Sequence, residues 1–100
     1  MPRKILAIIF ADSAVRDLDE ILDWYAAQQI PGVGEQLIKD IVSQVERLVD
    51  FPESGRIAPE FGIANLREII HPPFRIVYRL DESRVRIVRV WRSERLLKMP

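Results

Sequence analysis

The chain has 100 residues, of which 48% are hydrophobic and 30% charged, a composition typical of one ordinary globular domain over residues 1–100. Cysteine is absent and His71 is the only histidine, which excludes a disulfide framework, a thiolate metal site and a multi-histidine metal site. We therefore expect no metal and no cofactor. The formal net charge is zero, yet residues 1–50 hold five basic and nine acidic side chains, and residues 51–100 hold ten and six. Such an asymmetry is typical of a protein with an interaction surface on its basic side.

The first predicted element is a strand over the apolar run from Ile5 to Phe10. This run is too short for a transmembrane helix or a signal-peptide core, and Asp12 follows it at once. We expect a buried strand in a cytoplasmic protein that does not cross a membrane.

Two helices are predicted next, joined as a helical hairpin. An apolar stripe at helical spacing indicates an amphipathic helix over residues 12–28, with Asp12 or Ser13 as its cap. The stretch IPGVG at 30–34 is expected to end the first helix and let the chain reverse, and a second apolar stripe predicts a helix that ends near residue 51. We expect Trp24 and Tyr25 to pack in the core of the hairpin.

The second half of the chain predicts a long loop followed by strands. Residues 52–65 hold two prolines and two glycines and are expected to form the loop. Strands are predicted at 66–71, 74–80 and 84–92, the last one central in the sheet. The fold class is therefore α+β: an N-terminal strand, then a helical hairpin packed on one face of a mainly antiparallel sheet that ends in a three-stranded meander.

Seven arginines fall between residues 74 and 95, against three acidic residues. Alternation along strand 74–80 predicts that Arg75 and Arg79 lie on the sheet face away from the helices. Guanidinium groups there suit a nucleic acid or an acidic partner, and the alternative is a solvated face with arginine stems lying on the sheet. Trp91 is either a stacking platform or interface anchor, or part of the core. The candidate binding residues are Arg75, Arg79, Arg89, Trp91, Arg92 and Arg95.

The usual catalytic constellations are missing from the sequence. His71 is either a general acid or base, or a polar residue at a strand end before two prolines. Glu60, in the predicted loop, is either a general base beside Arg75 or an exposed loop glutamate.

Several stretches together resemble the RelE/ParE family of toxins from bacterial type II toxin–antitoxin systems. They are ADSAVRDLDEILDWY, LVDFPESGRIAPEF, LREIIHPPFRIVYRL and VRIVRVWRSERLL, and they span nearly the whole chain. The resemblance implies a small toxin that forms a hetero-oligomer with a cognate antitoxin, ParD-like or related, whose C-terminal segment wraps around it. RelE-like members cut messenger RNA on the ribosome, whereas ParE-like members poison DNA gyrase.

The residues favour the ParE-like branch. Glu60 and Arg75 match the base and phosphate clamp of one nuclease branch, but residues 90–93 supply no proton donor where that branch has one. The lysine-rich set of the RelE branch is also missing, and the chain is neutral overall. A noncatalytic gyrase inhibitor is therefore expected. The alternatives are a metal-independent, ribosome-dependent endoribonuclease using Glu60 and Arg75, and a degenerate member that binds its antitoxin and harms nothing.

Overall fold

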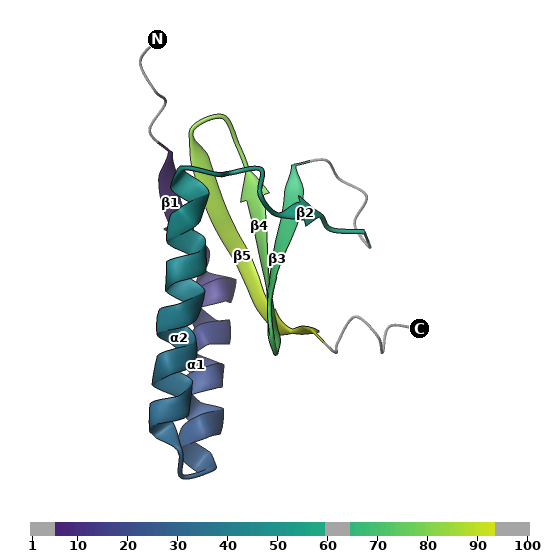
Figure 1. Cartoon of the computed structure of the whole chain (residues 1–100). Coiled ribbons are helices and arrows are strands. Elements are labelled where there is room, and N and C mark those ends of the chain that lie inside the picture. Colours follow the sequence, from purple (N-terminus) through teal and green to yellow (C-terminus); the bar gives the residue numbers. More distant parts are fainter. Residues whose placement is uncertain (1–5, 60–64, 94–100) are drawn as a thin grey trace.

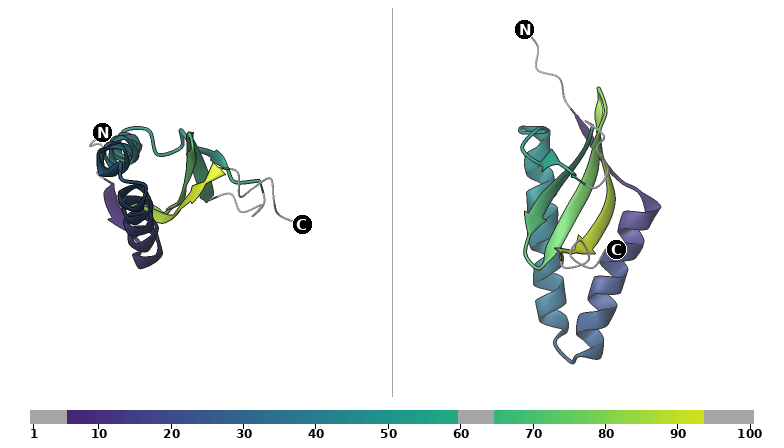
Figure 2. Two further views of the ribbon diagram at one scale, coloured as in Figure 1. Left: turned by 90° about the horizontal axis from the view of Figure 1, so that it is seen from below. Right: turned by 90° about the vertical axis from the view of Figure 1, so that its right-hand side faces the viewer.

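The computed structural model describes residues 6–59 and 65–93 (Figure 1). Two helices lie side by side as one layer against a five-stranded sheet, as both views in Figure 2 show. The elements in chain order are β1 (Ala7–Phe10), α1 (Asp12–Ala27), α2 (Pro31–Glu46), the 3-10 helix η1 (Arg47–Val49), β2 (Arg56–Ile57), β3 (Leu66–His71), β4 (Phe74–Leu80) and β5 (Arg84–Arg92). The predicted α+β class, with its helical hairpin and C-terminal meander, is confirmed.

The strand order in the sheet is β1-β5-β4-β3-β2. Only β1 pairs in parallel, with β5, and the other three pairings are antiparallel. The predicted central place of the last strand is confirmed. Two expectations were wrong: β1 is a partly exposed edge strand because it has β5 on one side only, and the short strand β2 lies inside the predicted loop 52–65.

The core lies between the two layers, because the apolar stripes of both helices face the same side of β4 and β5. Its buried side chains come from α1, α2, η1, β4 and β5; they are Ala14, Ile21, Ile41, Val45, Leu48, Phe74, Ile76, Tyr78, Val85, Ile87 and Val90. In the part of the chain that the structure describes, no helix is long and apolar enough to cross a membrane.

Both helix starts differ from the prediction. Helix α1 follows Ala11 without a side-chain cap, and the Ser13 hydroxyl instead donates to the carbonyl of Val88 at 2.6 Å. Helix α2 begins at Pro31, so the stretch predicted to reverse the chain forms the start of this helix instead. Proline suits the first helical position because its φ is already helical and its missing N–H would have no partner there. The reversal occurs at Gln29, whose φ is 63°.

A β-bulge shifts the register between β4 and β5. Val77 pairs with Arg89 but Tyr78 pairs with Ile87, so Val88 is the extra residue. Because of this shift, one face of the sheet carries both Arg84 and Arg86, which precede the bulge, and Arg89 and Trp91, which follow it. The bulge therefore explains why apolar residues of β5 fall at both odd and even positions.

The segment before β2 is anchored by Tyr78. Its hydroxyl donates to the carbonyl of Pro52 at 2.7 Å and accepts from the N–H of Gly55 at 3.0 Å. A Cβ on Gly55 would lie 2.6 Å from that hydroxyl and 2.7 Å from the carbonyl oxygen of Glu68, so only glycine fits. Burial raises the pKa of Tyr78 above its ordinary value of 10.0.

Candidate protein-binding surface

The face of the sheet turned away from the helices, called the outer face below, carries the arginine cluster. Figure 2 (right) shows this face toward the viewer, with the helices behind it. The cross-strand register places on it Arg75, Val77 and Arg79 from β4, Arg84, Arg86, Arg89 and Trp91 from β5, and Leu66, Glu68 and Ile70 from β3. The arginines divide into a paired and an unpaired group.

Arg75 belongs to the paired group, so the prediction that it is presented on the open face of the sheet was wrong. Its side chain is 1% exposed and forms an ion pair with Glu68, whose side chain is fully buried. The other carboxylate oxygen of Glu68 accepts from Nε of Arg56 at 2.6 Å. A guanidinium enclosed by strands needs a counter-charge, and β3 supplies it from the neighbouring strand. Arg75 is therefore integrated into the sheet rather than presented on its surface.

Arg89 is paired with a carboxylate of the helix layer. Its Nε and Nη2 donate to the two carboxylate oxygens of Asp17 at 2.8 Å each, and one of these oxygens also accepts from the backbone N–H of Val90 at 2.8 Å. The hydrogen bond with Asp17 raises the pKa of Arg89. Because β1 ends at Phe10, the second half of β5 has no strand on that side, and α1 provides its hydrogen-bonding partners instead.

Trp91 is half-buried beside these two arginines. The guanidinium carbon of Arg89 lies 4.8 Å from the centroid of its ring, and that of Arg75 lies 5.6 Å away. Both distances are in the range of cation–π interactions. The ring of Trp91 is thus engaged by arginines of its own chain, which fits neither the open stacking platform nor the plain core residue that the sequence suggested.

Arg79, Arg84 and Arg86 form the unpaired group. All three are exposed, and Arg79 and Arg86 lie directly opposite each other on β4 and β5. Among residues 6–59 and 65–93, none of the three forms an ion pair or a side-chain hydrogen bond. Their positive charge is therefore available to a partner.

A groove of about 410 Å³ opens between α1 and the strands β4 and β5. Its aromatic lining is Trp24, Tyr25, Phe74 and Trp91, and its charged lining is Asp17, Glu20 and Arg92. The guanidinium carbon of Arg92 lies 6.0 Å from the ring centroid of Trp24 and 5.7 Å from that of Phe74. Trp24 is 51% exposed, so its predicted place in the core was wrong. Aromatic side chains with polar rims are common anchors of protein interfaces.

A family profile described as the ParE toxin of the type II toxin–antitoxin system parDE matches residues 8–97. The chain belongs to the ParE toxin family. A search of curated proteins found no match.

Two of the solved structures that are similar to this ParE-family chain come from toxin–antitoxin systems. A chain of the chromosomal ParDE toxin–antitoxin system from P. aeruginosa is 26% identical, with a TM-score of 0.74 over 88% of this chain and 96% of that one. A chain of the toxin–antitoxin complex RelBE2 from Mycobacterium tuberculosis is 21% identical, with a TM-score of 0.63 over 88% of this chain and 98% of that one. The second likeness concerns the fold alone.

The remaining candidate residues of this ParE-family chain stand as follows. Glu60 and Arg95 lie outside the described residues. His71 ends β3, and its Nε2 lies 4.0 Å from a carboxylate oxygen of Asp40 on α2, at the outer limit of an ion pair. Within the described ranges, no group of three or more potential metal ligands occurs.

Sequence reasoning missed Asp17, Trp24 and Arg86. Trp24 directly precedes Tyr25 of the apolar stripe, and consecutive residues of a helix point in different directions. Trp24 therefore lies to the side of the stripe that faces the core, which could have indicated that it is exposed. No local signal marks the pairing of Asp17 with Arg89, since 72 residues separate them.

Proposed function

We propose that this protein is a ParE-family toxin that a cognate antitoxin neutralises and that inhibits DNA gyrase when it is free. The observation that carries the choice of gyrase over RNA cleavage is the burial of Arg75 in its ion pair with Glu68. The nuclease alternative needs Arg75 as a phosphate clamp. To bind a phosphate, the Arg75 guanidinium would have to leave the buried carboxylate of Glu68, and breaking a buried ion pair costs about 3–5 kcal/mol.

The end of β5 supports the same choice. Cleavage of RNA by its own 2′-hydroxyl requires a group that protonates the leaving oxygen. Trp91, Arg92 and Ser93 offer an indole, a guanidinium and an alcohol, and none of them gives up a proton readily at neutral pH. The hydroxyl of Ser93 moreover lies 3.1 Å from the carbonyl of Pro73, to which it donates. A protein that acts by binding needs no such group.

A cognate antitoxin is proposed as the partner because the chain matches the ParE toxin family and resembles a chain of a ParDE toxin–antitoxin system. The outer face and the aromatic groove supply the exposed charge and exposed aromatic surface that an antitoxin segment would cover. We place the resulting hetero-oligomer, and the encounter with gyrase, in the cytoplasm.

The decisive experiment is a gyrase assay with the purified toxin. Supercoiling activity and double-strand cleavage of plasmid DNA are followed with and without added antitoxin. We expect inhibition of gyrase that the antitoxin reverses. If gyrase is unaffected while the same toxin cleaves messenger RNA on ribosomes, the gyrase proposal is wrong.

The variant Glu60→Ala separates the two mechanisms in cells. A nuclease that uses Glu60 as its base would lose toxicity while still binding the antitoxin, whereas a gyrase inhibitor would keep its toxicity. Production of the wild-type toxin without antitoxin is the control, and growth unaffected by it would instead identify a harmless antitoxin-binding member.

A further inference from the structure

The opposed pair Arg79 and Arg86 is the feature of the outer face that intrachain contacts leave unexplained. The two residues are direct cross-strand partners on β4 and β5, and both are exposed. Like charges directly opposite each other destabilise a strand pair. Arg84 adds a third exposed guanidinium two residues along β5. The sheet therefore carries a local repulsion that no described carboxylate relieves.

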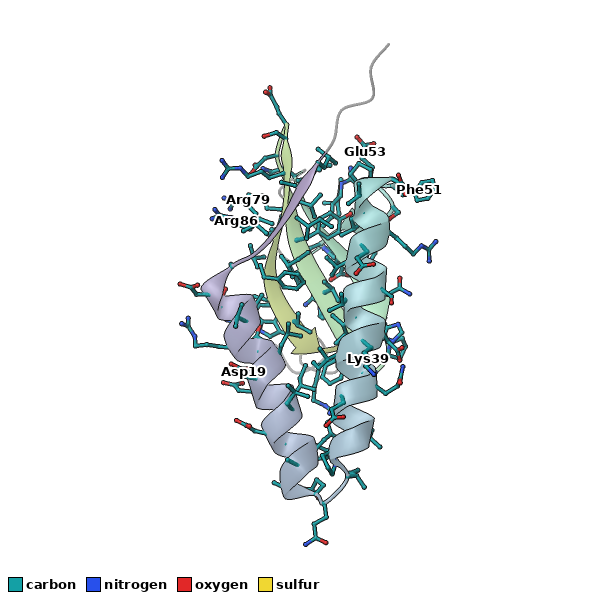
Figure 3. The ribbon with its side chains drawn as sticks, turned by 90° about the vertical axis from the view of Figure 1, so that its left-hand side faces the viewer. Asp19, Lys39, Phe51, Glu53, Arg79 and Arg86 are labelled. Atoms are coloured by element: carbon teal, nitrogen blue, oxygen red, sulfur yellow. The ribbon has the colours of Figure 1, made fainter. Side chains whose placement is uncertain are left out.

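The rest of the outer face shows that the chain does supply counter-charges elsewhere. Arg56 and Arg75 share Glu68, and Arg89 has Asp17, two buried carboxylates for three arginines. Figure 3 shows Arg79 and Arg86 next to each other, with the labelled carboxylates Asp19 and Glu53 well away from them. The missing counter-charge is thus confined to one end of the face.

The surroundings of the pair fit a polypeptide better than a nucleic acid. Across the sheet, the register gives the row Ile9, Arg86, Arg79, Leu66, in which an apolar residue flanks each arginine. A duplex would need a wide positive field, but the formal net charge is zero and α1 exposes four carboxylates, Asp12, Asp19, Glu20 and Asp23. Two charges between apolar flanks match an extended segment with acidic and apolar side chains.

We propose that Arg79 and Arg86 bind adjacent carboxylates of an acidic antitoxin segment lying across the outer face, and that Arg75 and Arg89 take no direct part. This inference deepens the proposed function and rests on it. Each guanidinium presents a planar fork that binds a carboxylate through two parallel hydrogen bonds. Binding then removes the repulsion between the arginines, so the like-charge pair becomes a device that favours the complex over the free toxin.

The test measures the affinity of the purified toxin for the antitoxin encoded beside it, by calorimetry, for the wild type and for Arg79→Glu/Arg86→Glu. We expect the double variant to bind on the order of 100-fold more weakly, because each reversal replaces a charge-assisted contact by repulsion. The matched control is Arg47→Glu, an exposed arginine of η1 in the helix layer, which should bind within about threefold of the wild type.

A single variant separates binding from folding. Arg79→Glu places a carboxylate directly opposite the guanidinium of Arg86, so the melting temperature of this variant should equal or exceed that of the wild type while its antitoxin affinity falls. Equal affinity of the double variant and the wild type would overturn the inference and leave the proposed function standing. A wild type that fails to bind the antitoxin would instead refute the proposed partner itself.

The alternative hypothesis, that the pair binds nucleic acid, is tested with the same proteins and a labelled DNA duplex of about 20 base pairs, whose binding is followed by fluorescence anisotropy. We expect no difference between the wild type and the double variant. Duplex binding that disappears in the double variant, with antitoxin affinity unchanged, would assign the pair to nucleic acid and overturn the inference.

Discussion

Replacement of Asp17 by alanine tests how α1 is joined to the sheet. The Asp17 side chain is 6% exposed and accepts three hydrogen bonds, two from Arg89 and one from the N–H of Val90. An orphaned buried N–H costs about 1–3 kcal/mol. The Arg89 side chain is 38% exposed, so solvent screens its ion pair and we count only about 1 kcal/mol for it. The expected loss is therefore about 3 kcal/mol.

Urea denaturation of purified variants measures this loss directly. For a domain of this size, about 3 kcal/mol corresponds to a fall in melting temperature of roughly 15 °C. Asp17→Asn keeps one acceptor oxygen for the N–H of Val90 and should lose only about 1 kcal/mol. Asp19→Ala, at an exposed position of the same helix, is the control and should stay within about 0.5 kcal/mol of the wild type.

The amide of Val90 provides an independent readout. Its hydrogen exchange, followed by NMR, should accelerate in Asp17→Ala more than in Asp17→Asn. If Asp17→Ala is as stable as Asp19→Ala, or if both Asp17 variants lose the same free energy, the assigned role of Asp17 as acceptor for Val90 is wrong.

Three further predictions concern the anchored segment before β2 and the buried ion pair. Tyr78→Phe should lower the free energy of unfolding by about 1–2 kcal/mol near neutral pH. Because burial raises the pKa of Tyr78, the stability that its neutral form contributes is complete below pH 10.0 and falls above it. The difference in free energy of unfolding between the wild type and this variant should therefore become smaller in denaturation curves recorded above that pH. Gly55→Ala should lower the free energy of unfolding by about 1–3 kcal/mol, because the added Cβ would overlap the Tyr78 hydroxyl. In the control Gly32→Ala the added Cβ has no neighbouring atom within 4 Å, so the same measurement should show no change or a slight stabilisation. Glu68→Gln should lower the free energy of unfolding by about 3–5 kcal/mol because it breaks the buried ion pair with Arg75. The double variant Glu68→Gln/Arg75→Met should recover part of this loss in a double-mutant cycle, and additive losses would contradict the ion pair.

Periodicity predicted the long elements well, because each helix and strand must bury one face. It failed where a residue has two structural uses. Proline breaks a helix at an interior position but is favourable at the first position, which Pro31 occupies in α2. The sequence does not show which of the two positions a proline will take. The reversal at Gln29 requires a positive φ from a residue that rarely adopts one, so nothing local indicated it.

The arginine cluster illustrates the same limit for the candidate site. The sequence correctly placed a cluster of arginines on the strands, yet it treated them as equivalent. Which of them are neutralised depends on carboxylates at a distance, 7 residues away for Arg75 and 72 for Arg89. The bulge at Val88 then brought Arg86 and Arg89 onto one face although they are three residues apart. Local patterns therefore identify the surface, and the tertiary pairing identifies its accessible charges.

The position of β5 also determines when the protein can fold during its synthesis. This strand is made last among the described elements, yet it pairs with β1 and β4 and supports α1. After Ala27 has been added, 65 more residues must follow before Arg92 completes β5. At about 5–20 residues per second this takes roughly 3–13 seconds, during which β1 and α1 cannot yet pack against β5. A nascent chain thus stays without its binding surface until β5 has been synthesised.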